Sequence, residues 1–114
     1  MSARVFLVGR LTEEVKARKV KDNTVANFTV VCNTRNKTEY INCTSWNKLA
    51  TRIEENTNKN MLVEVIGSWT TSTRVIDNKY KAIDSYVTVD DIQFLEAKRK
   101  EVNLFDLVEA NEEV

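Results

Sequence analysis

The chain has 114 residues, of which 42% are hydrophobic and 30% are charged, which is typical of one globular domain rather than of two domains or a disordered segment. It contains no histidine and only two cysteines, which excludes histidine-based catalysis and disfavours a zinc site, since such a site usually needs four Cys or His ligands. No stretch approaches the roughly 18 apolar residues of a membrane helix, and no secretory signal pattern opens the chain, so we expect a cytoplasmic protein.

The formal net charge is zero, but the charge is divided unequally along the chain. Residues 1–100 carry all 17 basic residues and 12 of the 17 acidic ones, a net charge of +5, whereas residues 101–114 carry five acids and no base. A mildly basic body suits a domain that contacts phosphate groups, although an ordinary solvated surface has the same appearance. We expect a domain over residues 1–97 and an acidic tail over residues 98–114.

The first half of the chain has the periodicity of strands. Residues 4–11 form a β-rich run in which Gly9 marks a bend or bulge, and residues 12–23 form a basic, irregular segment. Residues 25–33 and 39–45 alternate apolar and polar side chains across a short polar connection, which predicts a hairpin.

The period changes from two to 3.6 after this hairpin. Trp46, Leu49, Ala50 and Ile53 follow helical spacing, with Ser45 as the expected N-cap. Asn60 can close the segment in a left-handed conformation.

Two long strands are predicted in the second half, over residues 61–73 and 81–95, joined by a charged hairpin tip. Three strands, a helix and two further strands is the element order of the five-stranded OB-fold barrel, an all-β architecture with one helix that commonly binds oligonucleotides.

Two aromatic residues fall on one face of the strand before the helix. Because strand side chains alternate, Tyr40 and Trp46 share a polar face, and Ile41 and Cys43 share the opposite one. The rings are six residues apart, about 20 Å in a strand, and such a face can stack nucleic acid bases. The alternative interpretation makes Trp46 the first buried residue of the helix.

Three further positions bear on packing and assembly. Trp69 shares a strand face with Val63 and Val65, so we expect it in the core or an interface rather than on a stacking surface. Phe6 and Val8 make the first strand apolar on both faces, which predicts at least a dimer.

Other candidate chemistry is weak. Cys32 and Cys43 are expected to be small buried core residues rather than a disulfide. The acidic pairs at residues 13–14 and 90–91 lack a surrounding ligand set and are better explained as solvated faces. We therefore expect no metal, no cofactor and no enzymatic activity.

Four segments together resemble a known family. Residues 5–12, 25–29, 40–49 and 92–96 match the bacterial-type single-stranded DNA-binding protein family in sequence, order and spacing, and the resemblance covers residues 3–97. It implies an OB fold, homo-oligomerisation (most often a tetramer, with a dimer as the alternative) and sequence-tolerant binding of single-stranded DNA in replication, recombination or repair.

The resemblance also assigns roles to individual residues. Tyr40 and Trp46 match the family's stacking aromatics. Basic positions expected on the DNA path are Lys48, Arg18, Arg4 and Lys59, and Arg74 and Arg35 are further candidates from the two hairpin tips. Their expected role is to neutralise phosphates, and the alternative for each is a solvated surface charge.

The C-terminal end departs from the family pattern. With no proline and only two glycines, the chain lacks the long flexible linker of cellular bacterial members, so a compact, bacteriophage or mobile-element form is our hypothesis. The acidic tail carries an apolar cluster at Leu104, Phe105, Leu107 and Val108. This part of the tail either binds a partner such as a replication or recombination protein, competes for the DNA groove, or packs on its own barrel; the candidate partner-binding residues are Leu104, Phe105, Asp106 and Leu107. The alternative function is an OB-fold interaction module resembling primosomal protein N, with weak DNA binding.

Overall fold

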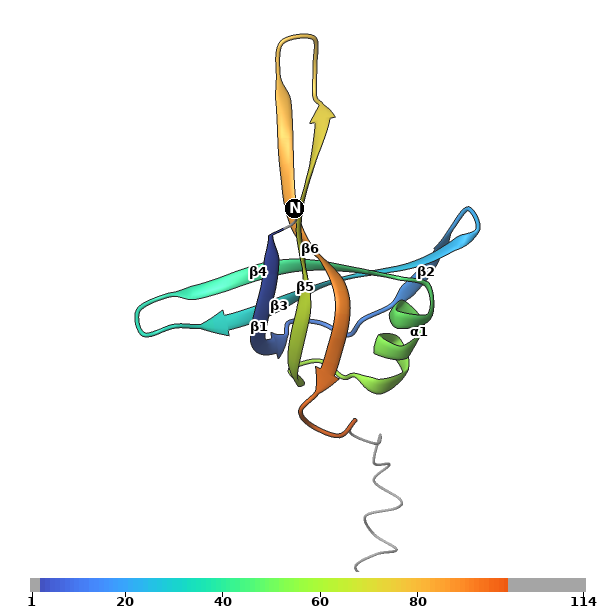
Figure 1. Ribbon diagram of the computed structural model, residues 1–114, viewed down its shortest axis with the longest axis vertical. Helices are drawn as coiled ribbons and strands as arrows, with labels where there is room; N and C mark the ends of the chain where they lie inside the picture. The colour runs from blue at the N-terminus through green and yellow to red at the C-terminus, as the bar shows by residue number, and fades with distance from the viewer. Residues whose placement is uncertain (1–2, 99–114) are drawn as a thin grey trace, which may run out of the picture.

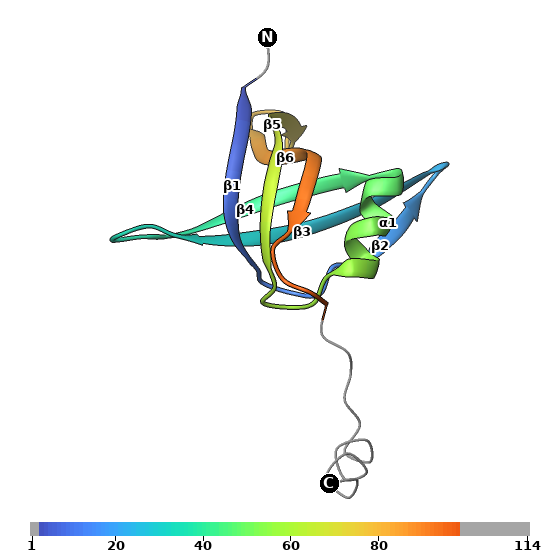
Figure 2. The same ribbon diagram turned by 60° about the horizontal axis from the view of Figure 1, so that its bottom comes forward.

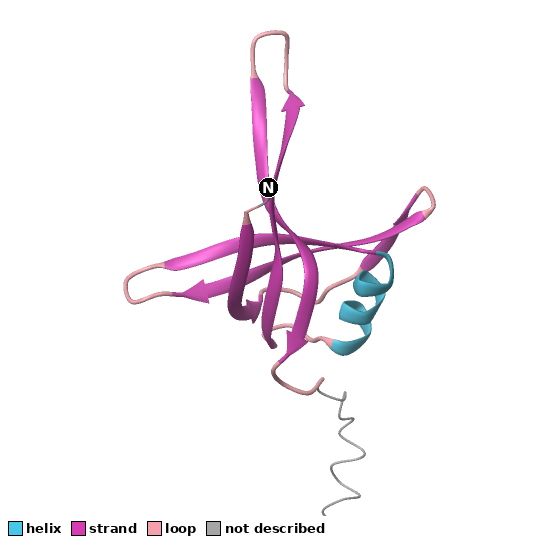
Figure 3. Ribbon diagram, in the orientation of Figure 1, coloured by secondary structure: helices cyan, strands magenta, loops and turns pink. Residues whose placement is uncertain are grey.

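The computed structural model describes residues 3–98, so the cluster predicted at residues 104–108 lies outside the described residues. Six strands and one helix follow each other along the chain (Figures 1 and 3). Their bounds are β1 Arg4–Leu11, β2 Ala17–Val20, β3 Asn23–Asn33, β4 Thr38–Trp46, α1 Asn47–Asn56, β5 Leu62–Val75 and β6 Lys81–Phe94.

The strands form one sheet in the order β1-β5-β6-β4-β3-β2, and an additional pairing of β1 with β3 closes five of them into a ring. All pairs are antiparallel except β4 with β6, which run parallel at Cys43 and Thr44. Figure 2 shows β1, β5 and β6 crossing the β3–β4 pair, with α1 beside β3. The closed ring of five strands, with its helix after β4, is the arrangement predicted from the element order.

The core lies inside this ring and is built from the inward positions of each strand. Val30, Val63, Val65, Val87 and Ile92 are completely buried, and they alternate with more exposed residues along their strands. Helix α1 covers one end of the core with Ala50 and Ile53, as its periodicity predicted. Cys43 is also buried, whereas Cys32 is half-buried, and both are free thiols.

The segment predicted to be irregular before β3 contains a strand, which is a correction. Strand β2 pairs with β3 from Ala17–Ala26 to Val20–Asn23. The connecting turn has no glycine, because Lys21 itself adopts a positive φ of 55°, and the usual sequence signal of a tight hairpin is therefore missing. The Glu54 carboxylate of α1 accepts a hydrogen bond from the Ala17 backbone N–H, which ties β2 to the helix.

Gly9 does not mark a bulge, because the β1–β5 register runs unbroken through the pair Gly9–Val63. The glycine is instead needed for the close approach of β1 to β3, since a Cβ at this position would lie 2.3 Å from the Val31 carbonyl oxygen. The irregularity in the sheet occurs between β5 and β6, at Ile66 and Gly67. Asn60 has a φ of 69°, which confirms its predicted left-handed conformation. It does not close the helix, however, because α1 ends at Asn56 with Thr57 as its C-cap.

Hairpins extend beyond the ring as arms (Figure 1). The β5–β6 arm stays paired out to Val75 and Lys81. Its closing turn is held by Asp77, whose Oδ1 accepts hydrogen bonds from the backbone N–H groups of Lys79 and Tyr80 at 2.7 and 3.0 Å. The β3–β4 arm is the outer part of that hairpin, which stays paired out to Asn33 and Thr38. It projects from the ring in a different direction from the β5–β6 arm (Figure 1).

Candidate nucleic-acid interface

The end of β4 decides the position of Trp46. This residue keeps an extended backbone, with φ −124° and ψ 144°, and Asn47 then turns the chain into α1 with a φ of 57°. Asparagine tolerates this left-handed conformation, and its Oδ1 accepts a hydrogen bond from the Thr24 backbone N–H at 3.0 Å. Trp46 therefore stays on the strand face and is 44% exposed.

Two helix-start expectations are thus wrong. Trp46 is not a buried helical residue, because the helix begins one residue later. Ser45 is not the N-cap, because it is completely buried within β4 and its hydroxyl points to the Ala26 carbonyl oxygen at 3.4 Å.

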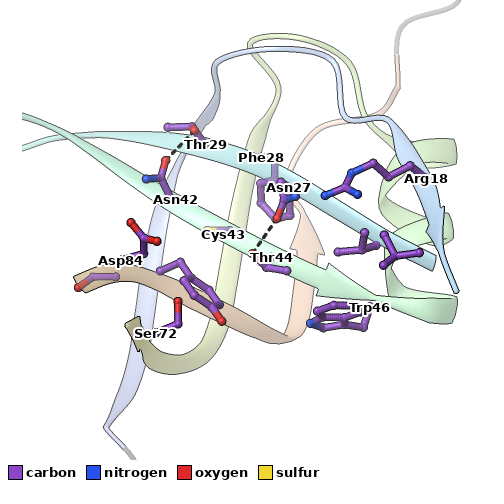
Figure 4. A pocket seen from close by; sticks show the side chains of 14 residues that line it. Arg18, Asn27, Phe28, Thr29, Asn42, Cys43, Thr44, Trp46, Ser72 and Asp84 are labelled. Atoms are coloured by element: carbon purple, nitrogen blue, oxygen red, sulfur yellow. Dashed lines mark hydrogen bonds between the residues drawn. The ribbon is translucent and has the colours of Figure 1, made fainter. Parts of the chain in front are cut away.

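Trp46 lines a groove of about 620 Å³ between the outer face of β2, β3 and β4 and the base of the β5–β6 arm (Figure 4). The β3–β4 part of this groove is polar. Thr29 donates a hydrogen bond to the Asn42 side-chain oxygen at 3.0 Å, and Thr44 donates one to that of Asn27 at 2.8 Å. These cross-strand pairs engage the amide oxygens of Asn27 and Asn42, and each amide group also carries N–H groups that can donate hydrogen bonds.

Arg18 from β2 and Asp84 from the arm are the charged residues in the groove lining. Arg18 and Trp46 both pair with Val25, from opposite sides of β3, so the two side chains share one face of the sheet with one strand between them. Tyr86 of β6 adds another ring to the lining, beside Trp46 and the buried Phe28, and was not among the predicted site residues. The alternation of β6 could have revealed it, since Tyr86 precedes the buried Val87 and so lies on the opposite face.

Tyr40 lines a neighbouring hollow of about 330 Å³, together with Trp69. Tyr40 is 68% exposed and Trp69 is 47% exposed. The expected core position of Trp69 is therefore wrong. Strand β1 begins opposite Ser68, and the Trp69 backbone N–H donates a hydrogen bond to the Ala3 carbonyl oxygen at 2.9 Å. Trp69 therefore lies at the edge of the closed ring, where the core no longer covers its side chain.

The predicted basic residues lie at several places rather than in one patch. Lys48 lines a third hollow, beside α1 and the β2–β3 hairpin, together with Lys19 and Arg52. Arg35 is exposed in the connection between β3 and β4. Lys59 lies in a small separate hollow near Met61.

Two of the predicted arginines are in ion pairs. Arg4 contacts the Asp90 carboxylate at 2.8 Å, and Arg74 contacts Asp84 at 3.1 Å. The two arginine side chains are largely exposed to solvent, and the two carboxylates are a little less than half exposed. The structure thus brings Arg18 together with Trp46, places Lys48 just beyond it, and leaves Arg4 and Lys59 outside the groove lining.

The cysteine thiols are unsuited to nucleophilic chemistry. Burial, and to a lesser degree the nearby Cys32, raises the pKa of Cys43 to about 12. The pKa of Cys32 is raised by burial and by the Glu39 carboxylate. Within residues 3–98, no three His, Cys, Asp or Glu side chains are grouped so that they could hold a metal ion. Over the same residues, no helix is long and apolar enough to cross a membrane.

A closed ring of five strands, with a helix after the third ring strand and exposed rings on a polar strand face, defines an oligonucleotide-binding domain of the OB class. The chain matches the model of the single-strand binding protein family over residues 2–95. It belongs to this family, which is one of DNA-binding proteins rather than of enzymes.

Two relatives support the assignment. The chain is 35% identical to the single-stranded DNA-binding protein of Caldanaerobacter subterraneus subsp. tengcongensis, over 86% of this chain and 71% of the relative. It is 29% identical to the single-stranded DNA-binding protein of Staphylococcus epidermidis, over 88% of this chain and 81% of the relative.

Proposed function

We propose that this protein binds single-stranded DNA with little sequence preference, by stacking bases on Tyr40 and Trp46 and by neutralising phosphates with basic side chains. The observation that carries the proposal is the single exposed strand face that runs from Tyr40 through Asn42 and Thr44 to Trp46, with hollows at both aromatic ends. Membership in the family and the names of the two relatives support the same ligand.

Stacking supplies the sequence-tolerant part of the affinity. Every base has a π-face, and a base–aromatic contact is typically worth about 1–3 kcal/mol. Trp46 and Tyr86 both line the main groove, so a strand lying there can stack on more than one ring. The amide groups of Asn27 and Asn42 can donate hydrogen bonds to bases or phosphates along the same path.

The electrostatic part of the affinity comes from cations near this path. Arg18 lies within the groove and Lys48 follows Trp46 at the start of α1. Arg4 and Arg74 are held by exposed carboxylates, and because such pairs contribute at most about 1 kcal/mol, a phosphate can replace the carboxylate. Arg35 and Lys59 complete the proposed set, although neither lines the groove.

Homo-oligomerisation is also part of the proposal. Phe6 is 64% exposed and lies opposite Ile66 on the outer face of β1 and β5, with the exposed Val8 beside it. β1 pairs with β3 only at Arg10 and Leu11, so most of that edge of β1 has no strand beside it among the described residues. An apolar face next to an open edge favours pairing with another copy; we favour a tetramer, with a dimer as the alternative.

The cellular setting stays a prediction. We infer that residues 1–97 form the DNA-binding domain and that residues 98–114 act as a separate acidic tail that binds a partner protein of replication or recombination. A cytoplasmic location, a role in replication, recombination or repair, and a bacteriophage or mobile-element source are expected from the sequence in the same way.

The proposal is tested by the anisotropy of a labelled thymidine oligonucleotide of about 35 nucleotides, a length that covers several OB sites. Tyr40→Ala and Trp46→Ala should each weaken binding by about 5- to 150-fold. Trp46→Phe, which keeps a ring, should lose much less. If the wild-type protein fails to bind at low salt, the function is wrong and the interaction module related to primosomal protein N becomes the better interpretation.

A further inference from the structure

The hollow beside the main groove contains two exposed rings that come from different strands. Tyr40 belongs to β4 and precedes Cys43, where β4 pairs with β6, by three residues. Trp69 belongs to β5, whose outer part forms the β5–β6 arm (Figure 1). The remaining lining residues are Glu39, Ile41, Asn42 and Ser85. The proposed stacking on Tyr40 and Trp46 does not use Trp69.

The chemistry of this hollow suits a nucleobase better than a phosphate. Two rings and the half-buried Ile41 give it an apolar wall against which a flat base can stack. Its charged residue is Glu39, whose carboxylate repels a phosphate but accepts a hydrogen bond from a base N–H group. Ser85 and Asn42 add donors and acceptors at the rim.

The hollow is also continuous with the main groove. Asn42 and Ser85 line both of them, so a strand that occupies the groove from Trp46 onward reaches the hollow without leaving the protein surface. Resting on the proposed function, we propose that Tyr40 and Trp69 together form a second base-binding subsite, and that Trp69 is a DNA-contacting residue.

Fluorescence isolates this subsite because the chain contains only two tryptophans. In the Trp46→Phe variant, Trp69 is the single indole, and its emission is followed during titration with a thymidine oligonucleotide while anisotropy of a labelled oligonucleotide measures binding independently. A base stacked on Trp69 should quench the emission, and the quenching should saturate together with the anisotropy.

Affinity gives a second readout. Trp69→Ala should weaken binding by about 5- to 150-fold, the range typical of losing one base–aromatic stack, whereas Trp69→Phe should recover most of that loss. Thr71→Ala is the matched control, because Thr71 is exposed two residues farther along the same strand and lines neither hollow. This control should bind like the wild type.

Three results would overturn the subsite. In the first, Trp69 emission stays unchanged when the oligonucleotide is saturating. In the second, Trp69→Ala binds DNA as tightly as the wild type. In the third, Trp69→Ala dissociates the oligomer in sedimentation, which would make a second copy of this chain the occupant of the hollow. Each differs from failure of the proposed function, in which the wild type itself does not bind the oligonucleotide.

Discussion

Replacing Gly9 with alanine should destabilise the fold, because the closure of the ring depends on the absence of a side chain there. An added Cβ would lie 2.3 Å from the Val31 carbonyl oxygen and 2.7 Å from a methyl group of Val30. The nearer atom belongs to the backbone, so a change of rotamer cannot relieve the contact. Reaching an ordinary contact of 3.4 Å would require a shift of about 1.1 Å between β1 and β3.

The size of the effect follows from what this shift disturbs. Overpacking a well-packed interior typically costs about 1–3 kcal/mol. The shift also strains the short β1–β3 contact, which consists of two residue pairs and the hydrogen bond from the Thr12 N–H to the Thr29 carbonyl at 3.1 Å; losing one such bond costs about 1 kcal/mol. We therefore expect a loss of about 2–4 kcal/mol in the free energy of unfolding, a large part of the roughly 5–15 kcal/mol of a typical domain.

Urea denaturation followed by circular dichroism measures this loss, at a fixed protein concentration because an oligomer's stability depends on it. The midpoint should fall by roughly 1–3 M with little change in slope. Gly67→Ala provides an independent repeat, since its Cβ would meet the Thr88 carbonyl oxygen at 2.3 Å. Without a steric conflict, Gly→Ala should instead stabilise by about 0.4–1 kcal/mol through the unfolded chain, so an unchanged or raised midpoint would refute the reasoning.

The other predictions concern charge, assembly and pH. Arg18→Ala should reduce the salt dependence of DNA affinity by about 0.7 in the slope of log K against log [salt], whereas Arg18→Lys should keep it; an unchanged slope for Arg18→Ala would remove this residue from the DNA path. Phe6→Glu should lower the molecular mass in analytical ultracentrifugation, and a wild-type-sized particle would show that assembly does not use the outer face of β1. Because burial raises the pKa of Cys43 from 9.0 to about 12, the folded state keeps a proton that the unfolded chain loses above pH 9, so stability should fall between pH 9 and 12. This loss should reach about 2–3 kcal/mol by pH 11 and should be missing in Cys43→Ala; equal pH profiles from thermal melts would contradict it.

Local periodicity was sufficient to predict much of the fold. The change from period two to 3.6 near Trp46 predicted both the strand and the helix, and the order of elements predicted the five-stranded ring. Strand alternation also predicted that Tyr40 and Trp46 share a face, because the direction of successive side chains is a property of the backbone itself.

Tertiary structure decided which parts of each face are covered. Alternation correctly placed Trp69 on the same face as Val65, but β1 begins only opposite Ser68, so Trp69 lies at the edge of the ring, and no sequence period contains that information. Tyr86 joins the groove only because the β5–β6 arm leaves the ring next to β4.

The remaining corrections have the same origin. Gly9 has the appearance of a bulge in sequence, yet its role is set by how closely a distant strand approaches. Arg4 and Arg18 look equivalent as isolated charges, but only folding brings Asp90 to one and the groove to the other. The sequence by itself therefore determined the elements and the direction of their side chains, whereas contacts between distant segments determined which of those side chains are available to a ligand.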